Sequence, residues 1–384
     1  MEPRYRLKLF LALALWLVLQ PLGVSGGMGA PALCFSNPIV QPGADPFVAW
    51  YDGFYYFTCT EGAGKNQINI RQARSLAGLQ SATPAVIWHA PDFGPDCRDI
   101  WAPELHLLQG HWYVYFAGTS TNEPDINRRM FVLESRDADP MGPYTEKARL
   151  GIPGDDHYAI DGTVLQQPDG SLYFIWSGRA VEQVGPQNLY IARMSNPWTL
   201  TGSRVKISSP EFDWEKKGWS VNEGPAVLQH NQAVFVTYSA SGGTTPDYCL
   251  GLLANTNGDL LNPRAWRKSP QPVFASYSGD DGKVFTVGHN SFFKSPDGRE
   301  DWIIYHGKEN QDGTWKGRSA RAQKFFWSTK GEPVFGHPVP AGIFIALPSG
   351  EPVMGLPNLG VPQNLNLNTN KSNRILTNQF IESP

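Results

Sequence analysis

The sequence has little charge, and no part of it concentrates charge of one sign. Only 17% of the 384 residues are charged, with 32 Lys and Arg against 35 Asp and Glu. Domains that bind nucleic acid carry a basic face or a run of basic residues. No such cluster occurs in this chain. We therefore expect no nucleic-acid partner.

Long hydrophobic runs are missing except near the N-terminus. The run Leu9–Leu19 is apolar throughout, but a helix needs about 20 apolar residues to cross a membrane. Basic residues precede the run, and the small residues of Val24–Gly27 follow it. This order is typical of a secretory signal peptide, which we place at residues 1–26; a membrane anchor is the alternative. The mature protein is expected to be extracellular and not membrane-bound.

Cysteine is scarce, and no CxxC pair occurs. The four cysteines are Cys34, Cys59, Cys97 and Cys249. Without CxxC pairs, a zinc ribbon is disfavoured. In a secreted protein an even number of cysteines permits two disulfides, but buried free thiols are equally compatible with the sequence.

Helical periodicity is not sustained anywhere in the mature chain. The sequence instead holds 39 Gly, 32 Pro and 12% aromatic residues. Aromatic residues favour strands, and Gly and Pro favour turns. The composition predicts an all-β protein of short strands.

Five stretches of the chain share one plan: a polar residue, an apolar segment, a tight turn and an aromatic-rich segment. They begin at residues 44, 102, 160, 222 and 288. Repetition at a regular spacing indicates a repeat architecture. The polar residues, which we place at equivalent positions of the five repeats, are Asp45, Glu104, Asp161, Glu223 and His289.

Each repeat predicts one blade of a five-bladed β-propeller. Asp-Gly and related pairs lie at the turns, and Asp-Gly is a strong hairpin signal. A further strand is expected after each hairpin, at Gln67–Ala73, Arg129–Ser135, Asn188–Met194, Cys249–Ala254 and Ser319–Trp327. A sandwich is the alternative, but a propeller explains why the polar residues recur, since its innermost strands line one channel.

The predicted propeller covers residues 27–350, and a C-terminal tail, residues 351–384, is expected to pack on it. Either Cys34–Val40 or the tail could close the ring. Since like charges close together raise the pKa of one partner, carboxylates facing a shared channel suit glycoside hydrolysis. That reaction needs a carboxylic acid and a carboxylate on opposite sides of the sugar.

Several short motifs resemble those of glycoside hydrolase family 43, from about Asn37 to about Pro338. They are Ala44-Asp45-Pro46, Trp101-Ala102-Pro103-Glu104, Ile160-Asp161-Gly162, Asn222-Glu223-Gly224-Pro225, Gly288-His289-Asn290 and Arg321-Ala322-Gln323-Lys324. The resemblance implies a five-bladed β-propeller and an inverting mechanism. It also implies that Asp45 is the general base, Glu223 the general acid, and Asp161 the residue that holds Glu223 and raises its pKa.

The resemblance implies further site residues. Trp101 would form a wall of the sugar subsite, although packing between blades is the alternative. Arg321 would reach toward the catalytic centre. Glu104 is interpreted as structural, bonding to loops near the site, and His306 as a core residue.

In arabinan-active members of the family, a histidine in the motif of His289 helps to hold a metal ion, commonly calcium, on the propeller axis. Calcium prefers oxygen ligands, so one imidazole would need water molecules to complete the shell. The resemblance thus predicts a structural ion at His289; a histidine satisfied by hydrogen bonds is the alternative. No organic cofactor is expected.

The motifs around His289 and Arg321 are most similar to the arabinan-active branch, and Ala44 before the base favours exo action. We therefore expect an exo-acting α-L-arabinofuranosidase that releases arabinose from arabinan or arabinose-substituted plant cell-wall polysaccharide, as a monomer. An endo-1,5-α-L-arabinanase or a β-xylosidase is the alternative within the family. A non-catalytic carbohydrate-binding propeller is the alternative outside it.

Overall fold

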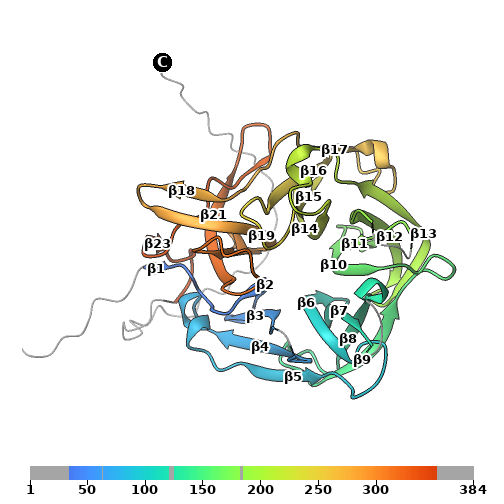
Figure 1. Cartoon of the computed structure of the whole chain (residues 1–384). Coiled ribbons are helices and arrows are strands. Elements are labelled where there is room, and N and C mark those ends of the chain that lie inside the picture. Colours follow the sequence, from blue (N-terminus) through green and yellow to red (C-terminus); the bar gives the residue numbers. More distant parts are fainter. Residues whose placement is uncertain (1–33, 63, 121–124, 182–184, 353–384) are drawn as a thin grey trace, which may run out of the picture. The chain divides into compact units, whose positions relative to one another are not determined.

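Five β-sheets surround a common centre in the computed structural model (Figure 1). The structure describes residues 34–352 except 63, 121–124 and 182–184. Four sheets have four strands each, and the fifth sheet has five. The five-bladed β-propeller predicted from the repeats is confirmed.

The strands of each blade follow one another along the chain. Blade one comprises β2 (Ala44–Tyr51), β3 (Phe54–Thr60), β4 (Gln67–Ala73) and β5 (Ala85–His89). Blade two comprises β6 (Arg98–Leu108), β7 (His111–Thr119), β8 (Arg129–Ser135) and β9 (Tyr144–Leu150). Blade three comprises β10 (Ala159–Gln166), β11 (Leu172–Gly178), β12 (Asn188–Asn196) and β13 (Thr199–Ser208).

Blade four comprises β14 (Asn222–His230), β15 (Ala233–Ala240), β16 (Cys249–Asn255) and β17 (Trp266–Lys268). Blade five comprises β18 (Tyr277–Gly279), β19 (Gly282–Lys294), β20 (Asp301–Lys308), β21 (Ser319–Trp327) and β22 (Pro333–Val334). The helices of the described residues are short 3₁₀ turns: η1 (Ala77–Gln80), η2 (Asp125–Asn127), η3 (Asp213–Glu215) and η4 (Pro263–Ala265). All the further strands expected from the sequence are present, to within two residues at their ends.

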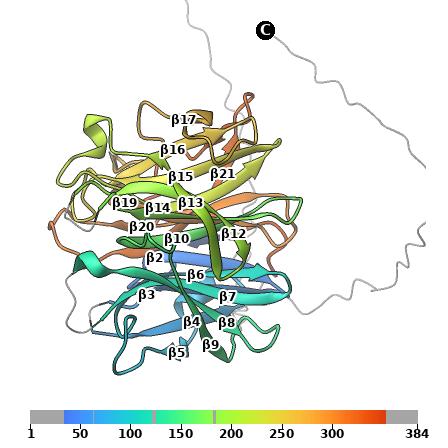
Figure 2. The same ribbon diagram turned by 90° about the vertical axis from the view of Figure 1, so that its right-hand side faces the viewer.

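The innermost strands form a closed circle. Strand β2 contacts β6, β6 contacts β10, β10 contacts β14, β14 contacts β19, and β19 contacts β2. Figure 1 shows these strands near the centre of the ring, with later strands of the blades farther out, and Figure 2 shows the blades from the side. In blade five the short strand β18 precedes the inner strand, so the channel is lined there by the second strand of the sheet.

Each inner strand contains a bulge at the same place. Pairing with the second strand skips two residues, at 45–46, 102–103, 161–162, 224–225 and 289–290. The first residue of each skipped pair has a left-handed backbone: Asp45 (φ 53°), Ala102 (45°), Asp161 (56°), Gly224 (52°) and His289 (45°). For a residue other than glycine this conformation costs about 1–3 kcal/mol, and such strain often marks functional sites.

The bulges correct the predicted alignment of the repeats. Asp45, Asp161 and His289 are equivalent, as expected, but Glu104 lies two residues after the bulge position and Glu223 one residue before it. The residue of blade two that is equivalent to Glu223 is Trp101. The sequence comparison missed this because a bulge changes which residues face one another without changing the local motif.

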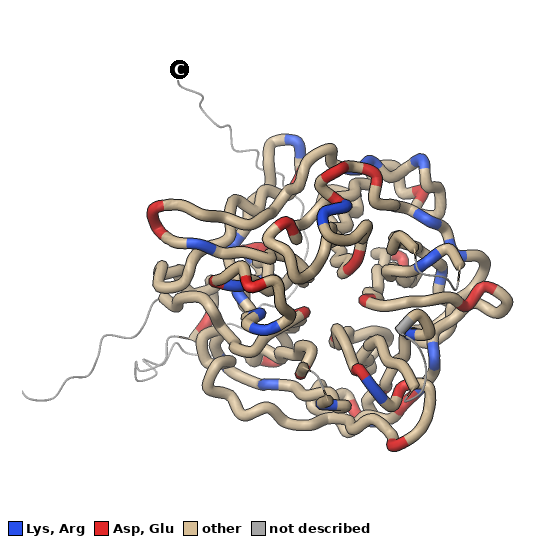
Figure 3. Tube along the Cα trace, viewed as in Figure 1, with Lys and Arg blue, Asp and Glu red and all other residues tan. Residues whose placement is uncertain are grey.

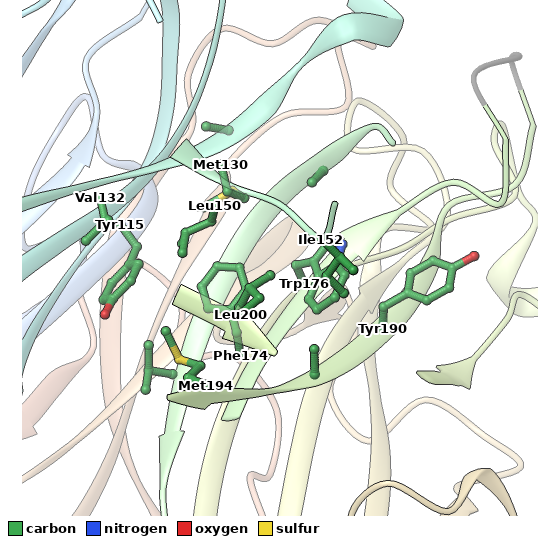
Figure 4. Close-up of a cluster of buried hydrophobic side chains, with 14 of the residues drawn as sticks. Tyr115, Met130, Val132, Leu150, Ile152, Phe174, Trp176, Tyr190, Met194 and Leu200 are labelled. Carbon is green, nitrogen blue, oxygen red and sulfur yellow. The ribbon is translucent and has the colours of Figure 1, made fainter. Parts of the chain in front are cut away.

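Apolar side chains fill the space between neighbouring blades. Figure 4 shows the cluster between blades two and three, where Tyr115 and Met130 meet Phe174 and Trp176. The rings of Phe174 and Trp176 stack at 5.7 Å. Sheets buried on both faces in this way hold the inner strands in fixed positions, as a precise active site requires.

The N-terminal segment closes the ring. The peptide N–H of Ile39 donates to the carbonyl of Ala320, and the N–H of Ala320 donates to the carbonyl of Val40. The side chain of Asn37 bonds the backbone of Ala322 in the same strand, β21. Strand β1 (Cys34–Ser36) also pairs with β23 (Phe344–Ala346). Residues 37–40, which precede the first blade, are thereby joined to the last blade.

Other expectations have mixed outcomes. Cys34, Cys59 and Cys249 carry free thiols, so two disulfides do not form. The predicted signal peptide, residues 1–26, and most of the predicted tail, residues 353–384, lie outside the described residues. Within residues 34–352, no helix is long and apolar enough to cross a membrane.

Candidate active site

Asp45 lies at the bulge of β2 and is surrounded by cationic or hydrogen-bonding groups. Its Oδ1 accepts from Nη1 of Arg318 at 2.8 Å, and its Oδ2 accepts from the hydroxyl of Thr60 at 2.7 Å. Nδ1 of His289 lies 3.3 Å from Oδ1, and Nδ1 of His306 accepts from the backbone N–H of Asp45 at 3.2 Å.

These neighbours keep Asp45 ionised. Burial alone would raise the pKa of its carboxyl, but the charge of Arg318 above all holds that pKa well below its usual range. The ring of His306 stays neutral, because burial lowers its pKa to about 4. A buried carboxylate that remains ionised can accept a proton from a water molecule, which is the task of a general base.

Glu223 has the opposite electrostatic character. The pKa of its carboxyl is raised to about 7: burial and the charge of Asp45 raise it, and a hydrogen bond from Tyr248 and the charge of Arg318 partly oppose the rise. The hydroxyl of Tyr248 donates to Oε1 of Glu223 at 2.9 Å. Near neutral pH a large fraction of Glu223 therefore carries a proton that it can donate.

Asp161 is placed to hold the strand that carries Glu223. Its Oδ2 accepts from the backbone N–H of Gly224, the next residue, at 3.1 Å. Burial raises the pKa of Asp161 well above its usual range, and the charges of Glu223 and Asp45 add to that effect. The neighbours that shift the pKa of Glu223 are instead Tyr248, Asp45 and Arg318, so the visible contribution of Asp161 is the hydrogen bond that holds Gly224.

Gly224 itself is a tight point of the site. Its φ is 52°, and a Cβ there would lie 3.2 Å from Cγ of His289. Glycine is needed for both reasons, since a side chain would strain the backbone and press on the neighbouring inner strand.

A cavity of about 610 Å³ opens beside Glu223. Trp101 lines it, and the guanidinium of Arg128 lies over the indole ring of Trp101, 3.3 Å from the ring centroid. The expected position of Trp101 at the cavity wall is therefore present in the structure. The cavity is lined further by Tyr158, Ile160, Arg179, Gly185, Pro186, Gln187, Gly218, Trp219, Ser220, Val221 and Trp315.

The structure corrects the expectation for Arg321. Its side chain is 1% exposed, and its Nη2 donates to Glu309 at 3.0 Å. It does not line the cavity. The arginine that contacts Asp45 is Arg318, three residues earlier and just before β21. The family motif lies on strand β21, whereas the residue that contacts Asp45 lies in the loop directly before that strand.

His289 reaches the axis, but a protein-made ion site is not evident. Among the described residues, no group of three or more His, Cys, Asp and Glu side chains could hold a metal ion. The Nδ1 of His289 faces Asp45, and burial lowers the pKa of the ring. The residues present do not fit a calcium site built from protein oxygens. An ion at His289 stays a prediction.

Glu104 and His306 differ in how well the sequence placed them. Glu104 is buried, as expected of a structural residue, but it bonds Nε2 of His106 on its own strand at 2.8 Å rather than a loop. His306 is a core residue, as expected, and it also touches the site: its ring lies parallel to that of Tyr248 at 5.6 Å. His306 thus contacts both Asp45 and Tyr248, the residue that donates to Glu223.

The sequence analysis missed five residues of the site: Thr60, Arg318, Tyr248, Trp219 and Trp315. The two tryptophans carried a usable signal, since each lies in a polar, glycine-containing loop where an apolar ring has no core to join. The other three lie on neighbouring strands or loops, and only the fold brings them to the carboxylates. Figure 3 shows acidic positions on the inner side of the ring, from different blades.

A β-propeller whose channel holds one strongly acidic and one weakly acidic carboxyl group has the parts of a glycoside hydrolase. The model of the glycosyl hydrolases family 43 matches residues 35–333. The chain belongs to that family, and it is a glycoside hydrolase.

Similar proteins have related printed names. The chain is 40% identical over 351 residues to an extracellular exo-alpha-(1->5)-L-arabinofuranosidase of Streptomyces avermitilis, covering 88% of this chain and 72% of the relative. It is 39% identical to alpha-L-arabinofuranosidase 43 of Humicola insolens, covering 82% of this chain and 65% of the relative. The crystal structure of an alpha-L-arabinofuranosidase from Lactobacillus brevis superposes with a TM-score of 0.74 at 40% identity, covering 80% of this chain and 98% of the other.

Proposed function

We propose that the protein is a secreted, exo-acting α-L-arabinofuranosidase that inverts the anomeric configuration. The observation that carries the proposal is the opposite shift of two carboxyl pKa values: that of Asp45 is lowered, and that of Glu223 is raised to about 7. An acid and a base that are both in the working protonation state near neutrality can act in one step.

In this mechanism Glu223 donates its proton to the glycosidic oxygen as the bond to the sugar breaks. Asp45 takes a proton from a water molecule that attacks the anomeric carbon from the opposite face. Inverting enzymes keep their two carboxyl groups roughly 6.5–9.5 Å apart to leave room for that water. No covalent bond forms between sugar and protein.

Asp161 and Arg318 act as positioning residues. Asp161 fixes the backbone beside Glu223 by accepting a hydrogen bond from the N–H of Gly224. Arg318 orients Asp45 and keeps its carboxylate ionised. Trp101, whose indole ring is held by the guanidinium of Arg128, offers a rigid surface against which the sugar packs.

The choice of arabinose rests on the printed names of the similar proteins, and arabinan or arabinose-substituted plant cell-wall polysaccharide is the proposed polymer. The relative of Streptomyces avermitilis is named extracellular, which supports secretion after removal of residues 1–26. A monomeric state remains a prediction.

The products released from linear α-(1→5)-arabinan test the proposed function. We expect arabinose alone from the first minutes of the reaction, because an exo-acting enzyme removes one residue at a time from the chain end. High-performance anion-exchange chromatography resolves the products. A ladder of oligosaccharides would indicate endo action, and release of xylose from xylo-oligosaccharides without arabinose from arabinan would indicate a β-xylosidase.

A further inference from the structure

Two large aromatic side chains remain exposed beside the catalytic cavity. Trp219 is 51% exposed and Trp315 is 53% exposed, although tryptophan usually buries most of its surface in a folded protein. Both line the cavity that also contains Glu223. Their rings stack on each other at 5.8 Å between centroids with 22° between planes.

The pair is built from two blades and held in place. Trp219 lies before β14 in blade four, and Trp315 lies between β20 and β21 in blade five. The backbone of Gly243 lies against Trp315, so a Cβ at Gly243 would come within 2.9 Å of its Cζ3. The guanidinium of Arg318 lies 5.1 Å from the centroid of the Trp315 ring. We call Trp219 and Trp315 the tryptophan pair.

The loop that carries Trp219 is anchored by a buried carboxylate. Glu215 is fully buried, and its Oε2 accepts from the backbone N–H groups of Glu211 and Phe212. Its Oε1 accepts from the side chains of Asn222, Tyr238 and Lys268. Because Asn222 directly precedes Glu223, the same anchor fixes the loop and the start of the strand that carries the acid.

The cavity has more room than one pentose needs. Its volume of about 610 Å³ is in the middle of the range of about 300–1,000 Å³ that is typical for pockets taking larger ligands. Its lining includes Glu223 but not Asp45. In the proposed mechanism Glu223 protonates the leaving oxygen, so the space beside it is on the side of the leaving group.

We propose that the tryptophan pair binds the sugar residue on the leaving side of the scissile bond and thereby selects chains over small glycosides. This inference rests on the proposed function and adds a specificity-determining surface to it. Flat aromatic faces pack well on the C–H faces of sugars, and both indoles of the stacked pair line the cavity while about half of each residue stays exposed. The tryptophan pair contacts the first sugar of the leaving chain, whereas Trp101 is proposed to contact the arabinose that is split off from the chain end.

Kinetics on two substrates test this proposal. Methyl α-L-arabinofuranoside has no sugar on the leaving side, whereas α-(1→5)-arabinotriose has two, the first of which would contact the tryptophan pair. For Trp219→Ala and Trp315→Ala, we expect kcat/KM on the trisaccharide to fall about tenfold, mainly through KM, which corresponds to one lost aromatic contact. On the methyl glycoside we expect a change of less than about twofold, and inhibition by free arabinose should be unchanged.

Three further variants guard against a trivial loss of folding. Gly243→Ala keeps both tryptophans but displaces Trp315, so it should reproduce the selective loss on the trisaccharide. Trp315→Phe keeps an aromatic face and should recover most of the activity on it. Phe93→Ala, at an 86% exposed aromatic residue that does not line the cavity, should match the wild type on both substrates.

The outcomes separate the two claims. Equal losses on both substrates, or no loss on either, would overturn the role of the tryptophan pair. If the wild-type protein hydrolyses neither substrate, the arabinofuranosidase proposal itself fails. Circular dichroism and the thermal midpoint of each variant show whether it is folded before its kinetics are compared.

Discussion

Replacing Asp45 by Asn is expected to lower kcat/KM by about 10²–10⁴-fold on every substrate, because the general base is lost whatever the leaving group. Asparagine is the suitable replacement since Asp45 has φ 53°, a conformation that Asn tolerates better than most residues. Asparagine also keeps an oxygen that can accept from Thr60 or Arg318. Initial rates on p-nitrophenyl α-L-arabinofuranoside and on arabinan measure the effect.

Asp52→Asn provides a matched control. Asp52 has φ 46° in the exposed turn between β2 and β3, so the same substitution is made in a similar backbone conformation away from the channel. We expect this variant to retain wild-type rates. Wild-type rates for Asp45→Asn on both substrates would remove Asp45 from the catalytic set.

Replacing Glu223 by Gln is expected to have an effect that depends on the leaving group. On arabinan, kcat should fall about 10²–10⁴-fold, because an alkoxide leaves poorly without a proton from a general acid. On p-nitrophenyl α-L-arabinofuranoside the fall should be much smaller, since p-nitrophenolate is already a stable leaving group. Equal losses on the two substrates would contradict the role of Glu223 as the acid.

The pH dependence of kcat/KM is a second test of the role of Glu223. Glu223 must be protonated to act, and its pKa is raised to about 7, so wild-type kcat/KM on arabinan should decline above about pH 7. Tyr248→Phe removes a hydrogen bond that favours the ionised carboxyl, so the decline should move to higher pH. Tyr305→Phe is the matched control, because Tyr305 bonds Gln323 instead. An alkaline limb that Glu223→Gln leaves in place would belong to another group.

The fold could be predicted from the sequence because its signals are local and repeated. Hairpin turns such as Asp52-Gly53 and strands with alternating apolar residues such as Gln67–Ala73 depend on short segments, and the structure has them as expected. Five copies of one plan then leave few architectures, since each blade must bury both faces against its neighbours. Closure by residues 37–43 could not be predicted, because it depends on backbone groups that every residue type carries.

The site was predicted in part. Short motifs on inner strands contain Asp45, Asp161 and Glu223. The fold brings them close enough for the charge of Asp45 to raise the pKa values of the other two. The alignment of the five repeats was wrong for Glu104 and Glu223, because the bulges decide which residues are equivalent.

The contacts that tune the carboxylates come from distant parts of the chain and leave no local pattern. Arg318 contacts Asp45 across 273 positions, and Tyr248 contacts Glu223 from the loop directly before β16 of the same blade. The motif predicts Arg321 near the catalytic centre rather than Arg318, because a motif indicates a strand but not the residue of the adjoining loop that contacts Asp45. These contacts follow from how the blades pack.

The central claim is that Asp45 and Glu223 act as base and acid in a single displacement by water. The anomer of arabinose first released from an α-L-arabinofuranoside tests it most directly, and proton NMR during the first minutes distinguishes the anomers before they equilibrate. The account predicts β-L-arabinofuranose as the initial product, because attack by a water molecule from the opposite face inverts the centre. Initial release of α-L-arabinofuranose would mean that a covalent intermediate forms and would contradict the role assigned to Asp45.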